Sequence, residues 1–242
     1  MKRIALLAAA AAALTATPAM ASGHLGLLYT NTSADDIAGD DVDGWQGEGA
    51  VGFSGGSWGG QFDASLGNLS VGSDDADTWA AAGHFWFDGG GTTSLGDTSY
   101  GVEGTIDLGA NFVANAAATW GSADFLTDLD TNMFDFGGDF YASPNVRFGA
   151  DFGFGNAEVS SFEADLQSIG VDAEFQPWSA PVSISVGYDS YEFDGDGPFD
   201  FSADTWSVGA RWNFGGGTLR DRDNVTPFDG RTAVWQRLFG VQ

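Results

Sequence analysis

Apolar and polar residues alternate along most of this 242-residue chain. The alternation predicts an all-β fold, a transmembrane antiparallel up-and-down β-barrel of about 12 strands, with 10 strands as the alternative. Two further observations favour this fold class. Aromatic residues gather at the ends of the alternating segments, as they do at the two surfaces of a membrane. After the N-terminus, no apolar run reaches the roughly 20 residues that a spanning helix needs, so a membrane crossing requires strands.

Residues 1–21 have the features of a secretory signal peptide. Lys2 and Arg3 precede an apolar stretch, and Ala19-Met20-Ala21 forms a cleavage site with small residues at its first and third positions. The apolar stretch is too short for a spanning helix. We therefore expect three regions: a signal peptide at 1–21, a transmembrane barrel at 22–214 and a periplasmic C-terminal tail at 215–242.

The predicted strands place apolar side chains toward lipid and polar side chains toward the interior. The clear segments are 45–54, 58–66, 100–108, 146–154, 169–175 and 206–214, and the weaker ones are 25–29, 79–87, 112–120, 134–141 and 182–188. They are odd in number, whereas bacterial barrels have an even number of strands. A short strand around Thr92 to Leu95 restores the parity, and for this reason we favour twelve strands.

The connections are expected to differ between the two ends of the barrel. Long polar loops rich in Asp, Gly and Ser are predicted at 32–43, 121–132, 156–164 and 190–203. Short turns are predicted at 55–56, 109–110, 143–144 and 177–181. An aromatic girdle is expected next to the long loops, formed by Trp45, Trp79, Trp120 and Trp206. A secreted β-sandwich is the alternative fold, but it places its aromatic residues in a core.

Composition and charge exclude several classes of function. The chain has no Cys, so it has neither disulfides nor thiolate metal sites. Its formal net charge of -26 repels nucleic acid, which binds through Lys and Arg. His24, expected to be solvated, and His84, expected to face the interior, are the only histidines, and neither belongs to a catalytic motif. We expect no enzymatic activity, no cofactor and no metal site, because the Asp-rich segments lack the spacing of a calcium loop.

Charged residues expected to line the lumen are mostly acidic. On the predicted register the inward side chains include Glu48, Asp63, Glu103, Asp107, Asp135, Asp139, Asp151, Asp172, Glu174 and Asp189, with Arg147 and Arg211 as the basic ones. Rings of Asp and Glu select cations in pores. The sequence therefore favours a porin-like channel for passive diffusion of small cationic or neutral solutes. The alternative is a structural or surface-interaction barrel that conducts little.

The end of the predicted barrel resembles a known signal. Ser207 to Phe214 has apolar residues at every second position, including Trp212 and the terminal Phe214, and looks like the barrel-assembly signal of Gram-negative outer-membrane proteins. Residues 215–223 are similar to the tails of small porin-like proteins of alphaproteobacteria. The resemblance implies the outer membrane of a Gram-negative bacterium, with the barrel-assembly machinery, outer-membrane lipid and lipopolysaccharide as partners. One departure is that 28 residues follow Phe214.

The tail, residues 215–242, differs in charge from the rest of the chain. It carries Arg220, Arg222, Arg231 and Arg237 against three Asp residues. Val234, Trp235, Leu238 and Phe239 have the spacing of one face of a short helix. Three locations stay open: a disordered extension, which is the default for a chain end, an interfacial helix, and a basic plug in the acidic lumen. Of the two ordered locations, opposite charge favours the plug or a tail docked at the rim.

Overall fold

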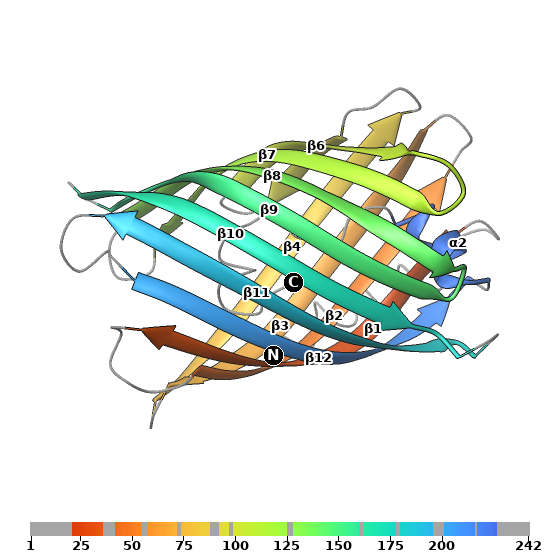
Figure 1. The fold of residues 1–242 in the computed structure, drawn as a ribbon, viewed down its shortest axis with the longest axis horizontal. Helices are drawn as coiled ribbons and strands as arrows, with labels where there is room; N and C mark the ends of the chain where they lie inside the picture. The colour runs from red at the N-terminus through yellow and green to blue at the C-terminus, as the bar shows by residue number, and fades with distance from the viewer. Residues whose placement is uncertain are drawn as a thin grey trace, which may run out of the picture.

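The computed structural model describes residues 21–35, 42–54, 58–71, 74–87, 92–96, 99–124, 128–159, 162–177, 180–195, 201–215 and 217–226. These residues form strands that wrap around a common axis (Figure 1). The strands are β1 (Ala21–Asp35), β2 (Val42–Ser54), β3 (Trp58–Val71), β4 (Asp74–Phe87), β5 (Thr92–Gly96), β6 (Ser99–Asp107), β7 (Phe112–Asp124), β8 (Asp128–Ser143), β9 (Val146–Val159), β10 (Phe162–Phe175), β11 (Val182–Gly195) and β12 (Phe201–Phe214).

Each strand pairs with its neighbours in the sequence, always antiparallel, and the first strand pairs with the last. The seam between β1 and β12 runs from Gly23 opposite Phe214 to Asp35 opposite Ser202, which closes the barrel. Because β1 and β12 pair with each other, neither of these two strands is a sheet edge. The predicted all-β, antiparallel, up-and-down architecture is confirmed.

The short strand β5 occupies the place where the parity argument puts one. Its pairing with β4 extends only from Ala82 opposite Gly96 to Phe85 opposite Thr93. A strand that crosses a membrane needs about 9–11 residues. The five residues of β5 make this the shortest part of the described wall.

The expectation of long loops at one end is wrong. The β7–β8 ladder extends to Asp124 opposite Asp128, and the β9–β10 ladder extends to Val159 opposite Phe162, so most of the predicted loop residues belong to strands. Strand pairing requires backbone hydrogen bonds, and polar side chains do not prevent it once a hairpin continues into water. The remaining connections at this end, residues 36–41, 72–73, 97–98, 125–127, 160–161 and 196–200, lie outside the described residues.

The outer face of the wall is apolar between two limits. On β10, Ile169 and Val171 point outward and are exposed, whereas Asp165 and Gln167, which point the same way further along the strand, are polar. Leu166, between them, points inward and is buried. The phase of the alternation therefore changes along the strand, with apolar residues outside in the middle of the wall and inside beyond it. This change marks where the apolar band ends.

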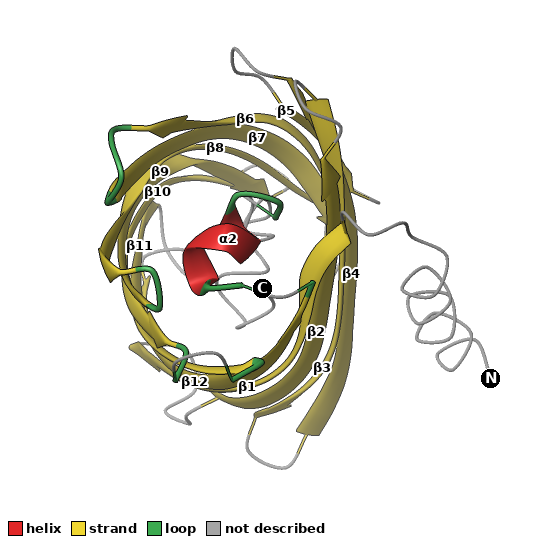
Figure 2. Ribbon diagram, turned by 90° about the vertical axis from the view of Figure 1, so that its right-hand side faces the viewer, coloured by secondary structure: helices red, strands yellow, loops and turns green. Residues whose placement is uncertain are grey.

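A short helix follows the last strand. This helix, α2 (Leu219–Asp223), lies inside the ring of strands at one mouth of the barrel (Figure 2). Among the described residues, no helix is long and apolar enough to span a membrane. We call the mouth that contains α2, where β1 begins and β12 ends, the tail end, and the opposite mouth the far end.

Candidate functional site: the lumen and its tail end

Glycines at the end of β12 turn the chain back into the barrel. Gly215 and Gly217 have φ values of 93° and 97°, in the left-handed region that favours glycine. Thr218 then caps α2: its side chain accepts a hydrogen bond from the backbone of Asp221, and the Asp221 side chain accepts one from the Thr218 backbone. The backbone nitrogen of Arg220 donates to the carbonyl of Pro144 at 3.1 Å, which attaches α2 to the β8–β9 turn.

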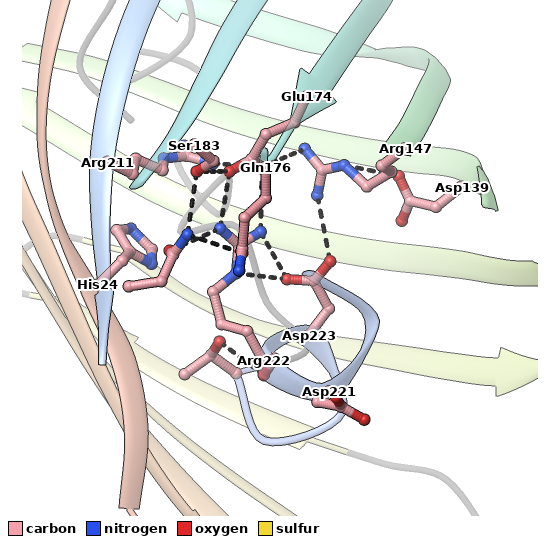
Figure 3. A network of polar contacts seen from close by, with 12 residues as sticks. His24, Asp139, Arg147, Glu174, Gln176, Ser183, Arg211, Asp221, Arg222 and Asp223 are labelled. Atoms are coloured by element: carbon pink, nitrogen blue, oxygen red, sulfur yellow. Dashed lines mark hydrogen bonds and ion pairs between the residues drawn. The ribbon is translucent and has the colours of Figure 1, made fainter. Parts of the chain in front are cut away.

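Arg222 of α2 binds Glu174 of β10 through two hydrogen bonds. Nη1 lies 2.7 Å from Oε1, and Nη2 lies 3.0 Å from Oε2 (Figure 3). Both residues are almost fully buried, at 2% and 1% relative exposure. Such a bidentate pair fixes orientation as well as charge. Burial lowers the pKa of Arg222, but the carboxylates of Asp223 and Glu174 outweigh burial and raise that pKa above its usual value.

Two arginines of the wall share Glu174 with Arg222. Arg211 of β12 lies 3.2 Å from Glu174 and 2.6 Å from Glu48. Arg147 of β9 lies 3.6 Å from Glu174 and 2.9 Å from Asp172. Figure 3 shows the three guanidinium groups converging on this one carboxylate. Among the described residues, every arginine lies at the tail end, so the basic charge of the lumen is concentrated there.

The tail contacts the wall on several sides of the mouth. The hydroxyl of Tyr141 on β8 donates to Asp223 at 2.7 Å. Arg220 binds Asp107 at the end of β6 at 2.5 Å, and its guanidinium lies 4.7 Å from the centre of the Tyr141 ring. On β2, a Cβ added at Gly52 would lie 2.2 Å from the carbonyl oxygen of Val225, so only glycine admits the tail there. These contacts hold α2 across the mouth.

The predicted lumen acids fall into two groups. Asp107 lies at the lip of the tail end and is exposed, and Asp139 lies 3.7 Å from Arg147 near the same end. Deeper in the lumen, Asp151 of β9 and Asp189 of β11 approach each other across Gly170 of β10, where an added Cβ would lie within 2.6 Å of an oxygen of each. We call the second group the mid-lumen acids, and with Asp135 and Glu103 they line the middle of the wall.

The two histidines lie inside the wall. His84 is buried, and its Nε2 lies 3.0 Å from Asp63 Oδ2 on the neighbouring strand, which agrees with an inward position. His24 does not have the solvated position expected from the sequence. It lies near the tail end, 3.8 Å from Glu48, and only 11% of its side chain is exposed. The expectation failed because it did not foresee that Arg211, Glu48 and the tail would fill this mouth.

The aromatic residues lie near the limits of the apolar band. Trp45, Trp120 and Trp206 are exposed on the outer surface, and Trp206 is 62% exposed. Trp45 packs against Tyr29, with ring centres 5.0 Å apart. The side chain of Trp79 lies outside the described residues. At the limit of the band near the tail end, Trp212 is exposed. There the backbone carbonyl of Phe214 accepts a hydrogen bond from the Ser22 hydroxyl at 3.2 Å.

An apolar patch on the inner wall was not foreseen. We call it the inner apolar patch, and it consists of Met133, Ala157, Leu166, Tyr191, Phe193 and Ala203. It lies toward the far end, where the alternation has changed phase. Four of its members, Ala157, Tyr191, Phe193 and Ala203, fall in segments expected to be loops, which is why the sequence analysis did not find it. The alternation of Tyr191 and Phe193 with Glu192 and Asp194 was the available signal.

Within the described residues, no group of three or more His, Asp or Glu side chains has an arrangement that could hold a metal ion. Described carboxylates of the lumen contact histidine, arginine and tyrosine side chains. The charged groups of this site act electrostatically. It can attract or repel charged solutes, and it can hold the tail.

Comparisons with known proteins place the fold. No family model matches the chain, and no curated protein sequence matches it. It is similar to an outer membrane channel from Pseudomonas putida F1, with a TM-score of 0.59 and 11% identity over 82% of this chain and 97% of that one. It is also similar to the β domain of the Bordetella autotransporter BrkA, with a TM-score of 0.50 and 11% identity over 81% and 100% of the two chains. The CymD monoaromatic hydrocarbon channel has a TM-score of 0.50 and 8% identity over 84% and 91%. At these identities the likeness shows a common fold, that of outer-membrane β-barrels.

Proposed function

We propose that this protein is a porin-like channel in the outer membrane of a Gram-negative bacterium, and that all twelve strands line a pore for passive diffusion of small solutes. One observation carries the proposal: the wall has an apolar outer band and, at the same level, an inner surface lined by carboxylates. Lipid suits the first surface and water suits the second. In this reading residues 1–21 are removed as a signal peptide before insertion.

The mid-lumen acids are proposed to favour cations. Asp151 and Asp189 both approach Gly170, and arginines of the described residues pair with Asp172, Glu48 and Asp107 toward the tail end. A cation that enters from the far end therefore meets negative charge first, whereas an anion is repelled. The proposed solutes are small and cationic or neutral.

The ends of the barrel are proposed to meet the remaining partners. Trp212 and Phe214 at the end of β12 would form the signal read by the barrel-assembly machinery, and the exposed tryptophans would lie among outer-membrane lipid and lipopolysaccharide. We also propose that residues 215–223 are related to the tails of small porin-like proteins of alphaproteobacteria. None of these partners is needed for the measurement of conductance.

Selectivity in planar bilayers tests the proposal. Under a salt gradient, the reversal potential should indicate cation preference, and the double change Asp151→Asn and Asp189→Asn should reduce it. Glu163→Gln is the matched control, because Glu163 is exposed on the outer surface at the far end. An anion-selective pore would overturn the acidic-lumen reading, and equal effects of the two changes would show that the effect is not local to the lumen.

A second candidate function has its own observations. A structural or surface-interaction barrel that conducts little is favoured by α2 across the tail end and by the inner apolar patch near the far end. Both features narrow a lumen that a diffusion pore would keep open. Absence of current from the full chain and from a tail-deleted chain, with the barrel correctly inserted, would favour this second function over the first.

A further inference from the structure

The guanidinium of Arg222 occupies a site built by the barrel wall. Besides the two hydrogen bonds to the Glu174 carboxylate, its Nη1 donates to Oδ1 of Asn213 at 3.1 Å. Glu174 belongs to β10 and Asn213 to β12, so three oxygens of the wall face one planar group. We call these three oxygens the Glu174 site. They match a guanidinium, whose donors form a rigid fork, better than an ammonium, which is a compact point charge.

The Glu174 site is oriented by contacts that do not involve the tail. The hydroxyl of Ser183 on β11 donates to Oε1 of Glu174 at 2.5 Å (Figure 3). The amide nitrogen of Asn213 donates to Ser183 at 3.1 Å and to Gln176 at 3.2 Å, which leaves its oxygen facing Arg222. The wall therefore holds these acceptors in place when Arg222 leaves. A preorganised site of this kind loses less free energy in ordering its groups when a ligand binds.

The wall around the Glu174 site has an excess of negative charge. Two arginines, Arg147 and Arg211, contact four carboxylates of the wall, those of Glu48, Asp139, Asp172 and Glu174. Two positive charges therefore stand against four negative ones before the tail is counted. An excess of this sign raises the local concentration of cations. Arg222 supplies one cation, and a cationic solute would meet the same charge.

Both sides of the contact keep a partner when they separate. Arg222 is also paired with Asp223 of the tail, with Nη2 and Nε at 2.6 and 2.7 Å from Oδ1. Glu174 is also paired with Arg211 at 3.2 Å and lies 3.6 Å from Arg147. Breaking a buried pair is costly chiefly because one charge is left without compensation. Here neither charge is, so exchange of one guanidinium for another is favoured over a permanent contact.

We propose that the Glu174 site binds solutes that carry a guanidinium group, and that Arg222 fills it as a tethered ligand that such a solute displaces. A tethered group has an effective concentration in the millimolar range, so the solute must be present at comparable concentrations. As the class of solute admitted by the channel, this inference rests on the proposed function. Binding itself needs no conduction, so the tests below measure binding and leave the result for current separate.

Calorimetry tests the vacated site. Full-length protein with Arg222→Met is titrated with L-arginine, and saturable binding is expected, with none for L-lysine. The matched variant adds Glu174→Gln and should bind neither, while heat-modifiable gel mobility confirms that both barrels are folded. No saturable binding of L-arginine to a folded Arg222→Met barrel would overturn the proposal, and so would equal binding of L-lysine.

A second measurement leaves the wall and Arg222 unaltered. The chain contains no cysteine, so a single Thr226→Cys in the tail, at a position that is 4% exposed, reports release of the tail by its reaction with a water-soluble maleimide. By mass action, L-arginine at twice its Kd for the vacated site should increase the released fraction, and with it the labelling rate, about threefold. Asn224→Cys, which is exposed, is the control and should react at a constant rate. Equal acceleration by L-lysine would show displacement by charge alone, and no acceleration by L-arginine would show that no solute displaces Arg222. Either result overturns the proposal.

Discussion

Glu174 organises the tail end of the lumen at the level of single residues. Its carboxylate accepts hydrogen bonds from Arg222, Arg211 and Ser183 and has almost no contact with solvent. Burying a charge costs free energy of desolvation, which a paired opposite charge offsets. Removing one partner leaves the other charge buried without this compensation. Because Arg222 belongs to the tail and Glu174 to the wall, this pair determines whether the tail stays in place.

Loss of Arg222 should release α2 while leaving the barrel intact. Breaking a buried pair by removing one partner costs on the order of 3–5 kcal/mol. Arg211 and Arg147 remain near Glu174, so the lower part of that range is expected for Arg222→Met. Trypsin should then cleave after Arg220 faster than in the unaltered protein. Asp43→Asn is the control, because Asp43 accepts hydrogen bonds from Tyr29 and Asn31 far from α2. Equally fast cleavage in this control would contradict the prediction that Arg222 holds α2 in place.

Gly52 provides a steric test of the same contact. An added Cβ there meets the carbonyl of Val225, whereas one at Gly83 on β4 meets nothing within 4 Å. Gly52→Ala should therefore displace residues 225–226 and increase proteolysis of the tail, and Gly83→Ala should not. The readout is the rate of tail loss by mass spectrometry. Equal rates in the two variants would show that Val225 does not pack as described.

Strands are the elements that the sequence predicts best, as long as the phase of alternation is constant. The apolar band of β10, Ile169 to Phe175, was foreseen because every second residue is apolar and points outward. The continuation through Leu166 was not, because its apolar residues face inward and its polar residues outward. In water that is the ordinary arrangement of a sheet with one buried face. The predicted loop at 156–164 therefore extended into the start of β10, and residues 165–168 were assigned to no strand.

The helix α2 shows a different limit of prediction. The spacing in the tail indicated a helix at 234–239, which lies outside the described residues, whereas the described helix is at 219–223. The local signals for α2, a glycine run followed by Thr218 and Asp221 as a capping box, were present in the sequence. The partner of Arg222 was not predictable, because it depends on a contact between residues 48 positions apart.

Removing the tail should open the tail end. Deletion of residues 218–242 takes away α2 and two of the guanidinium groups at this mouth. Single-channel conductance should rise, or gating should decrease, while insertion persists because Trp212 and Phe214 remain. Planar-bilayer recording with a parallel insertion assay checks both parts. Identical traces before and after deletion would mean that the tail does not restrict the pore.

The whole molecule separates charge along its axis. Carboxylates line the middle of the lumen, and the described arginines gather at the tail end. Cation preference should therefore depend on ionic strength, since the Debye length falls from about 10 Å at 0.1 M salt to about 3 Å at 1 M. The cation-to-anion permeability ratio should move toward one over that range. A ratio that is constant with salt would indicate selection by size instead of charge.

The seam between β1 and β12 has a kinetic consequence. Gly23 lies opposite Phe214, so the first and last strands meet only after nearly the whole wall has been synthesised. Contacts of such large sequence separation form slowly, because chain entropy must be lost before they contribute. Arg222 follows the last strand and requires Glu174 on β10. The bidentate ion pair spans only 48 positions and does not involve β1, so a refolding time course that follows both contacts shows whether the tail binds before or after the seam closes.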